Sequence, residues 1–151
     1  MQERLDPWKA APGAYKAMSA LQAYVNGCGL EKSLLELVKL RASQVNSCAF
    51  CIAMHARDAR AGGESHERLD LLNAWREAPV YTDRERAALA WTEAVTLISE
   101  THAPDDVYSE VRAHFSEAET VNLTMLIATI NSWNRLAISF RALPPVRAKA
   151  A

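Results

Sequence analysis

Apolar residues recur along the chain at intervals of three and four positions, which is the spacing of one face of an α-helix. After Pro12, the positions Ala14, Met18, Leu21 and Val25 follow this spacing until two glycines interrupt it. Proline suits the first turn of a helix and glycine suits its end. The strict alternation that indicates β-strands is nearly absent, so the pattern predicts a helix here and helices in the rest of the chain.

Three more helices are expected in the first half of the chain. The second covers about residues 31–44. Ser47 is a plausible N-cap for the third, which ends at the glycine pair 62–63, and Ser65 can cap the fourth.

Two later helices begin with stronger signals. Thr82 and Ser116 are each followed three positions later by a glutamate, which is the pattern of a capping box. Between them, Pro104 fits the first turn of a short helix. The last helix is expected over about residues 117–141, and its middle, LTMLIATI, is apolar on nearly all sides. Such a helix is buried in a core or between subunits.

The sequence therefore predicts an all-α bundle of about six or seven helices in a single domain over residues 1–151, with VRAKAA as a frayed tail. Half of the residues are apolar and the net charge is −1, which argues against disorder and against a nucleic-acid or anionic-membrane partner. The N-terminus does not have the pattern of a secretory signal, and no apolar run approaches the ~18 residues of a membrane span. We expect a cytoplasmic protein, where disulfides are transient and catalytic rather than structural.

The stretch NSCAFCIAMH carries the candidate chemistry. With Ser47 as N-cap, Cys48 is expected in the first helical turn and Cys51 one turn later, so that the two side chains are neighbours. A small adjustment of that turn would allow a disulfide to form. The partial positive charge of a helix N-terminus lowers the pKa of a thiol there, which favours the reactive thiolate.

His55 follows Cys51 by four positions, so the two side chains share one helical face. An imidazole there can accept the thiol proton or return a proton to a leaving group. This geometry couples Cys51 to the base and makes Cys48 the second thiol.

Two other interpretations of the cysteine pair stay open on spacing alone. The thiols can be inert core residues, or they can form a zinc site together with His55. A fourth zinc ligand would have to come from one of several scattered residues: Cys28, His66, His102 or His114. Closed zinc sites usually contain two paired clusters, and only one is present. The chain has no phosphate-binding glycine loop and no haem-attachment motif, so we expect neither a metal nor an organic cofactor.

A longer pattern resembles a known family. Glu36, eleven intervening residues, Cys48-Ala-Phe-Cys51, three more residues and His55 match the motif of the alkyl hydroperoxidase D (AhpD) family, within the carboxymuconolactone decarboxylase superfamily. The segments TDRERAALAWTEAVTLI and INSWNRLAISF are similar as well, and the resemblance extends over roughly residues 5–140. One position differs, because Phe50 replaces a histidine that well-known members carry before the second cysteine. This removes one proton-relay group.

The resemblance implies an AhpD-like all-α fold that assembles as a trimer or hexamer. It implies peroxide reduction by a reversible dithiol, with Cys51 as the peroxidatic cysteine, Cys48 as the resolving cysteine, and His55 and Glu36 as the proton relay. The reductant would be a lipoyl protein or a thioredoxin-like donor. The decarboxylases of the superfamily lack the cysteine pair, which argues against lactone decarboxylation. The alternatives are a general thiol–disulfide oxidoreductase and a redox-sensing or assembly module without turnover.

Several polar residues have two interpretations. Glu36 can be a solvated side chain paired with Lys32 or Lys39, or a carboxylate directed towards His55. Within the last helix, the polar residues of INSWNRL can cap neighbouring helix ends and form intersubunit salt bridges, or they can line the pocket over the dithiol. These residues are Asn131, Asn134 and Arg135. Cys28 is expected to take no part.

Overall fold

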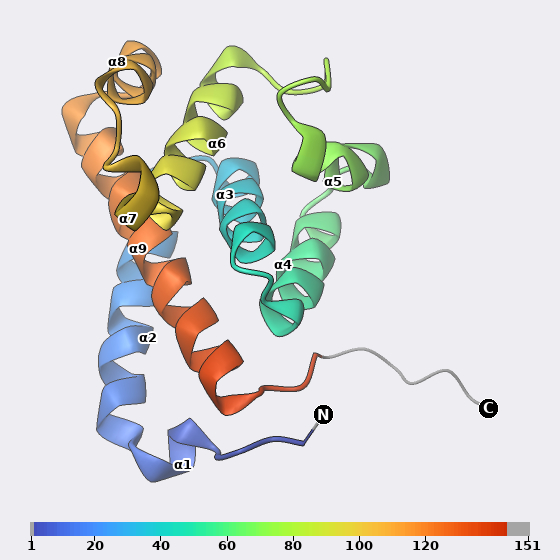
Figure 1. The fold of residues 1–151 in the computed structure, drawn as a ribbon, viewed down its shortest axis with the longest axis vertical. Helices are drawn as coiled ribbons and strands as arrows, with labels where there is room; N and C mark the ends of the chain where they lie inside the picture. Colours follow the sequence, from blue (N-terminus) through green and yellow to red (C-terminus); the bar gives the residue numbers. More distant parts are fainter. Residues whose placement is uncertain (1, 145–151) are drawn as a thin grey trace.

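The computed structural model describes residues 2–144, and the expected VRAKAA tail lies outside them. In this part of the chain the regular structure consists of nine α-helices and one 3-10 turn, with no β-strand (Figure 1). The all-α prediction is therefore confirmed, but the number of helices exceeds the expected six or seven. The additional helices include α1 (Pro7–Ala10) and α7 (Ile98–Thr101), which have four residues each and are too short to show an apolar repeat.

The longer helices lie close to their predicted positions. They are α2 (Pro12–Asn26), α3 (Lys32–Val45), α4 (Ala49–Ala61), α5 (His66–Leu71) with the 3-10 turn η1 (Leu72–Ala74), α6 (Asp83–Thr96), α8 (Asp105–His114) and α9 (Glu117–Phe140). Both capping boxes form as expected, and Ser65 caps α5. Pro104 is the N-cap residue of α8 rather than part of its first turn.

Helix α3 lies at the centre of the bundle, between two apolar clusters (Figure 1). Leu34 and Val38 pack into a cluster shared with α2, α6, α8 and α9. Leu37 and Leu40 pack into a second cluster shared with α4, α5, η1 and α6. Because both sides of α3 are covered beyond its exposed first turn, buried polar side chains such as Lys39 and Ser43 have to find partners inside the protein.

The apolar middle of α9 is covered on one side. Leu126, Ile127 and Ile130 are buried, whereas Val121 and Met125 are exposed on the single chain. No helix within residues 2–144 is long and apolar enough to cross a membrane.

Glu93 on α6 connects three parts of the bundle. Its carboxylate accepts hydrogen bonds from the Trp75 indole at 2.8 Å and from Arg41 of α3 at 2.8 Å, and it also pairs with Arg76. Burial opposes the charge, but these three donors outweigh it and hold the pKa of Glu93 below its ordinary value. Glu93 thereby fixes the segment after α5 against α3 and α6.

Replacing Glu93 with glutamine tests this connection. Glu93→Gln keeps the shape but loses the charge, so we expect the free energy of unfolding at pH 7 to fall by about 1–3 kcal/mol. Because the folded pKa of Glu93 is lowered, the stabilisation by the carboxylate is present above its ordinary pKa of 4.5 and is lost as the pH falls through the folded value. Urea unfolding of wild type and Glu93→Gln from pH 7 down to pH 3 should show that the difference between their free energies of unfolding becomes smaller. Glu77→Gln, at an exposed position, is the control and should change little.

Candidate active site

The cysteine pair lies at the joint between α3 and α4. Asn46 is the C-cap of α3, Ser47 has a left-handed backbone with φ of 57°, and Cys48 is the N-cap of α4. The prediction of Ser47 as N-cap is therefore wrong by one residue, and Cys48 precedes the first helical turn instead of lying in it. The reason is the tight reversal of the chain, which ends with the Cys48 N–H donating to the Ser43 carbonyl at 2.9 Å.

A cluster of three asparagines holds this joint against α9. The Asn46 side-chain amide donates to the Asn131 side chain at 2.6 Å and to the Asn134 side chain at 2.8 Å. Asn134 is fully buried and donates in turn to the Ser43 hydroxyl at 3.1 Å. The polar interruption of α9 thus secures the end of a neighbouring helix, which is one of the two interpretations made from sequence.

Asn134 also lies beside the dithiol, where its side chain acts to lower the pKa of both Cys48 and Cys51. A pocket over the dithiol lined by these polar residues stays a prediction. For Arg135, a salt bridge to another subunit and a place in a pocket over the dithiol both stay predictions. Its guanidinium donates to the Asn131 carbonyl at 3.0 Å, one turn back along the same helix.

Both cysteines are reduced and buried, with exposed fractions of 1% for Cys48 and 2% for Cys51. The Cys51 thiol donates a hydrogen bond to the Cys48 sulfur. The backbone N–H groups of Cys51 and Phe50 donate to the same sulfur. The donated Cys51 hydrogen bond is the main cause that lowers the pKa of Cys48 to about 7, against the opposing effect of burial. The same hydrogen bond, together with burial, raises the pKa of Cys51. Of the two thiols, Cys48 therefore ionises more readily than Cys51.

Glu36 and His55 form the second half of the site. The Glu36 carboxylate lies 3.0 Å from His55 Nδ1, between α3 and α4. Burial opposes ionisation of Glu36, but hydrogen bonds from His55 and Lys39 hold the pKa of this carboxyl below its ordinary value. An ionised carboxylate only accepts hydrogen bonds, so His55 Nδ1 is the donor. In the neutral form of His55, Nε2 is then the acceptor.

His55 Nε2 is buried and has no hydrogen-bond partner among residues 2–144. It therefore bonds to neither thiol, although His55 and Cys51 share the helix as the sequence predicted. A proton that passes from Cys51 to His55 has to cross a bridging group, such as a water molecule or the hydroxyl of a substrate. Phe50 is half-buried at the start of α4 and provides no such group.

Lys39 extends this arrangement. Its ammonium group lies 2.9 Å from the second Glu36 oxygen and 3.1 Å from the Asn26 side-chain oxygen. Both interpretations of Glu36 are therefore correct at once, since one carboxylate oxygen faces His55 and the other faces Lys39. The sequence pattern did not single out Asn26 or Asn46. Each stands at the end of a helix, where asparagine is common, and that position was the only signal available.

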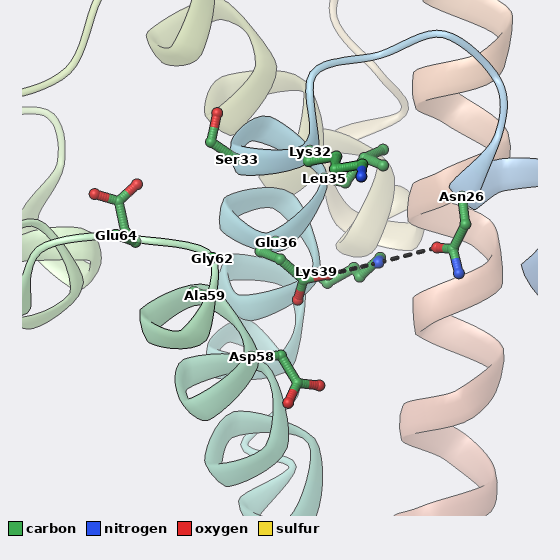
Figure 2. Close-up of a pocket in the computed structure, with 10 residues that line it drawn as sticks. All are labelled: Asn26, Lys32, Ser33, Leu35, Glu36, Lys39, Asp58, Ala59, Gly62 and Glu64. Atoms are coloured by element: carbon green, nitrogen blue, oxygen red, sulfur yellow. Dashed lines mark hydrogen bonds and ion pairs between the residues drawn. The ribbon is translucent and has the colours of Figure 1, made fainter.

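A cavity of about 350 Å³ opens beside the Glu36–Lys39 pair, between the end of α2, α3 and the second half of α4 (Figure 2). Neither Cys48 nor Cys51 lines it. Within residues 2–144, no three histidine, cysteine or acidic side chains lie close enough together to hold a metal ion. Cys28 packs against the apolar cluster around α2 and α9.

Comparisons with known proteins agree with this fold. The model of the "Carboxymuconolactone decarboxylase family" matches residues 12–94. The protein YdfG of Bacillus subtilis is 41% identical over 139 residues, which cover 92% of this chain and 95% of YdfG. Protein ATU0492 of Agrobacterium tumefaciens, proposed to be an antioxidant defence protein AhpD, has a crystal structure that superimposes with a TM-score of 0.94 at 49% identity, covering 97% of this chain and all of that one. The debrominase Bmp8 shares the fold with a TM-score of 0.83 at 18% identity, over 91% of this chain and 74% of its own.

The hydrogen bond between the two sulfurs can be tested by alkylation. In a Cys28→Ser background, the rate of iodoacetamide modification at Cys48 should rise with pH to half its maximum near the pKa of about 7. Cys51→Ala removes the donated hydrogen bond and should move this midpoint upward. Mass spectrometry at each pH measures the rate, and an unchanged midpoint in Cys51→Ala would contradict the assignment of the donor.

A double-mutant cycle can test the contact between Asn46 and Asn134. Asn46→Ala and Asn134→Ala should each lower the free energy of unfolding. The double variant should lose less unfolding free energy than the sum of the two single losses. We expect a coupling free energy of about 0.5–3 kcal/mol, as for residues in one hydrogen-bond network. Urea unfolding measures it. Asn73→Ala combined with Asn134→Ala is the control pair and should be additive, because Asn73 hydrogen-bonds with Arg41 instead.

Proposed function

Because the chain belongs to the carboxymuconolactone decarboxylase family and carries a reduced cysteine pair beside a glutamate–histidine pair, we propose that it is a dithiol peroxidase. Its substrates are alkyl hydroperoxides or hydrogen peroxide. The observation that carries this proposal is the hydrogen bond from the Cys51 thiol to a Cys48 sulfur whose pKa is lowered to about 7. Two sulfurs in that contact need only a small movement to form a disulfide.

The first step consumes the peroxide. The Cys51 proton passes through a bridging hydroxyl to His55 Nε2, which the structure leaves free to accept it. The Cys51 thiolate attacks the terminal peroxide oxygen, the O–O bond breaks, and Cys51 becomes a sulfenic acid. The departing alkoxide takes the proton back from His55 and leaves as an alcohol, or as water when the substrate is hydrogen peroxide.

The second step forms the disulfide. The Cys48 thiolate, which the lowered pKa of this thiol favours, attacks the sulfenic sulfur of Cys51, forming the S–S bond and expelling hydroxide, which takes a proton from solvent. The low pKa of Cys48 thus suits the resolving role. Glu36 accepts the hydrogen bond from His55 Nδ1–H throughout. The opposite ring nitrogen, Nε2, therefore points away from Glu36 and is the nitrogen that takes up and returns the reacting proton.

An external dithiol has to reduce the disulfide and complete the cycle. We propose a lipoyl protein or a thioredoxin-like donor, because thiol–disulfide exchange requires an attacking thiolate on the partner. We place the reaction in the cytoplasm, where such donors are kept reduced. We also propose that the chain acts as a homo-oligomer, a trimer or hexamer, in which the exposed Val121 and Met125 of α9 are covered.

Peroxide turnover with dihydrolipoamide as reductant tests the function. Wild-type protein should consume cumene hydroperoxide at a steady rate, and Cys51→Ser should fall to the uncatalysed background because the nucleophile is lost. Cys48→Ser should react once and stop, with Cys51 trapped by dimedone as a sulfenic acid. Cys28→Ser is the control and should keep full activity, since that thiol lies outside the site.

Three results would overturn this scheme. A dimedone adduct on Cys48 in the Cys51→Ser protein would reverse the roles of the two cysteines. Disulfide exchange with lipoamide but no peroxide consumption by the wild type would show a general thiol–disulfide oxidoreductase. Oxidation that changes only the oligomeric mass would show a redox-sensing module.

A further inference from the structure

Lys39 is a buried cation within the site. Only 5% of its surface is exposed, and its ammonium group is held by Glu36 at 2.9 Å and Asn26 at 3.1 Å (Figure 2). A lysine is rarely buried to this extent without a paired charge. Its partner here is the same carboxylate that orients His55, so Lys39 acts on His55 through Glu36.

The charges of the three side chains determine the state of His55. With Lys39 positive, Glu36 negative and His55 neutral, the buried group has no net charge. Without Lys39 the same group would carry −1, and a proton on His55 would restore neutrality. Because a net charge in a protein interior is unfavourable, the presence of Lys39 favours neutral His55.

We propose that Lys39 is a positioning residue that keeps His55 in the neutral form, with Nε2 free to accept a proton. An isolated glutamate–histidine pair would favour a histidine that is already protonated and unable to act as a base. With Lys39 in place, Glu36 still orients the ring, but its charge is already balanced. The expected change in the rate of peroxide turnover rests on the proposed function. The expected protonation state of His55 does not.

Among the other titratable groups, the Cys48 and Cys51 thiols lie at the start of α4 and interact with each other. The remaining charged groups near the pair are engaged elsewhere. Asp58 pairs with its neighbour Arg57 at 3.0 Å, and Glu64 pairs with Arg68 at 2.8 Å. Lys32 lines the same cavity from the exposed first turn of α3, and no salt bridge joins it to Glu36 in the part of the chain that is described. Lys39 is therefore the cation that balances Glu36, and Lys32 provides a matched control.

The cavity gives this arrangement access to water. Glu36 and Lys39 line it, while Cys48 and Cys51 do not (Figure 2). Solvent in the cavity therefore reaches the Glu36–Lys39 end of the arrangement without reaching the thiols.

Nitrogen NMR of histidine-labelled protein tests the inference without any substrate. At pH 7, wild-type His55 should show a protonated Nδ1 and a bare Nε2. In Lys39→Met both nitrogens should be protonated, whereas Lys39→Arg and the control Lys32→Met should resemble the wild type. Lys39→Gln should behave like Lys39→Met, because glutamine can donate hydrogen bonds but carries no charge.

A second substitution separates charge from structural damage. In Lys39→Met/Glu36→Gln neither buried charge remains, so His55 should return to the neutral form. Structural damage would not be reversed in this way. The double variant also removes the unpaired carboxylate, so it provides a test if Lys39→Met alone does not fold. Unchanged His55 nitrogen shifts in both Lys39→Met and Lys39→Gln, or a His55 that stays doubly protonated in the double variant, would overturn the inference.

The rate of peroxide turnover provides a second readout. The acid limb of the pH–rate profile should move upward by about one to three pH units in Lys39→Met, as expected for loss of a neighbouring charge, and should stay in place in Lys32→Met. If the wild type has no peroxidase activity, the proposed function fails, while the NMR result still decides the role of Lys39. An active Lys39→Met with an unmoved acid limb would contradict the inference.

Discussion

The site depends on the contact of Asn46 with the two asparagines of α9. The chain reverses direction between α3 and α4 within residues 46–48, and Ser47 has to adopt a left-handed backbone to allow it. Hydrogen bonds from Asn46 to Asn131 and Asn134 hold this reversal in place. Asn134 then reaches the sulfurs as well. The joint therefore places Cys48 at the helix N-terminus and also supplies a polar neighbour for the dithiol in an otherwise apolar core.

The central position of α3 explains the remaining polar groups. Both sides of this helix are buried, so Glu36 and Lys39 cannot be solvated like ordinary surface charges. They satisfy each other, and Glu36 also binds His55 across the interface with α4. The interior of the bundle therefore contains three linked side chains, Lys39, Glu36 and His55. At one end of this series, His55 Nε2 has no hydrogen-bond partner in the described part of the chain. Stability and proton transfer use the same carboxylate.

Much of this could be predicted from the sequence. The all-α class and the capping boxes at Thr82 and Ser116 followed from spacing, because helical periodicity and local caps depend on near neighbours. The pairing of Glu36 with His55 followed only from the family resemblance, because the two residues lie on different helices. The N-cap at Cys48 followed from neither, because the left-handed backbone at Ser47 is imposed by packing of the two helices. The contacts of Asn46 with α9 join residues 85 and 88 positions apart, and no local pattern reports them.

The short joint between α3 and α4 also limits how the protein can vary through evolution. Glu36 and His55 face each other across that joint, so their meeting depends on the number of residues between them as well as on their identity. Each residue added within a helix turns everything beyond it by about 100°. An insertion in α3 or α4 between these two positions would aim one side chain away from the other and separate the imidazole from its carboxylate. We therefore expect substitutions at the other positions of α3 and α4 to be tolerated more readily than insertions or deletions between Glu36 and His55. Changes of length should be tolerated better in peripheral segments, such as the region of α5 and the short helices α1 and α7.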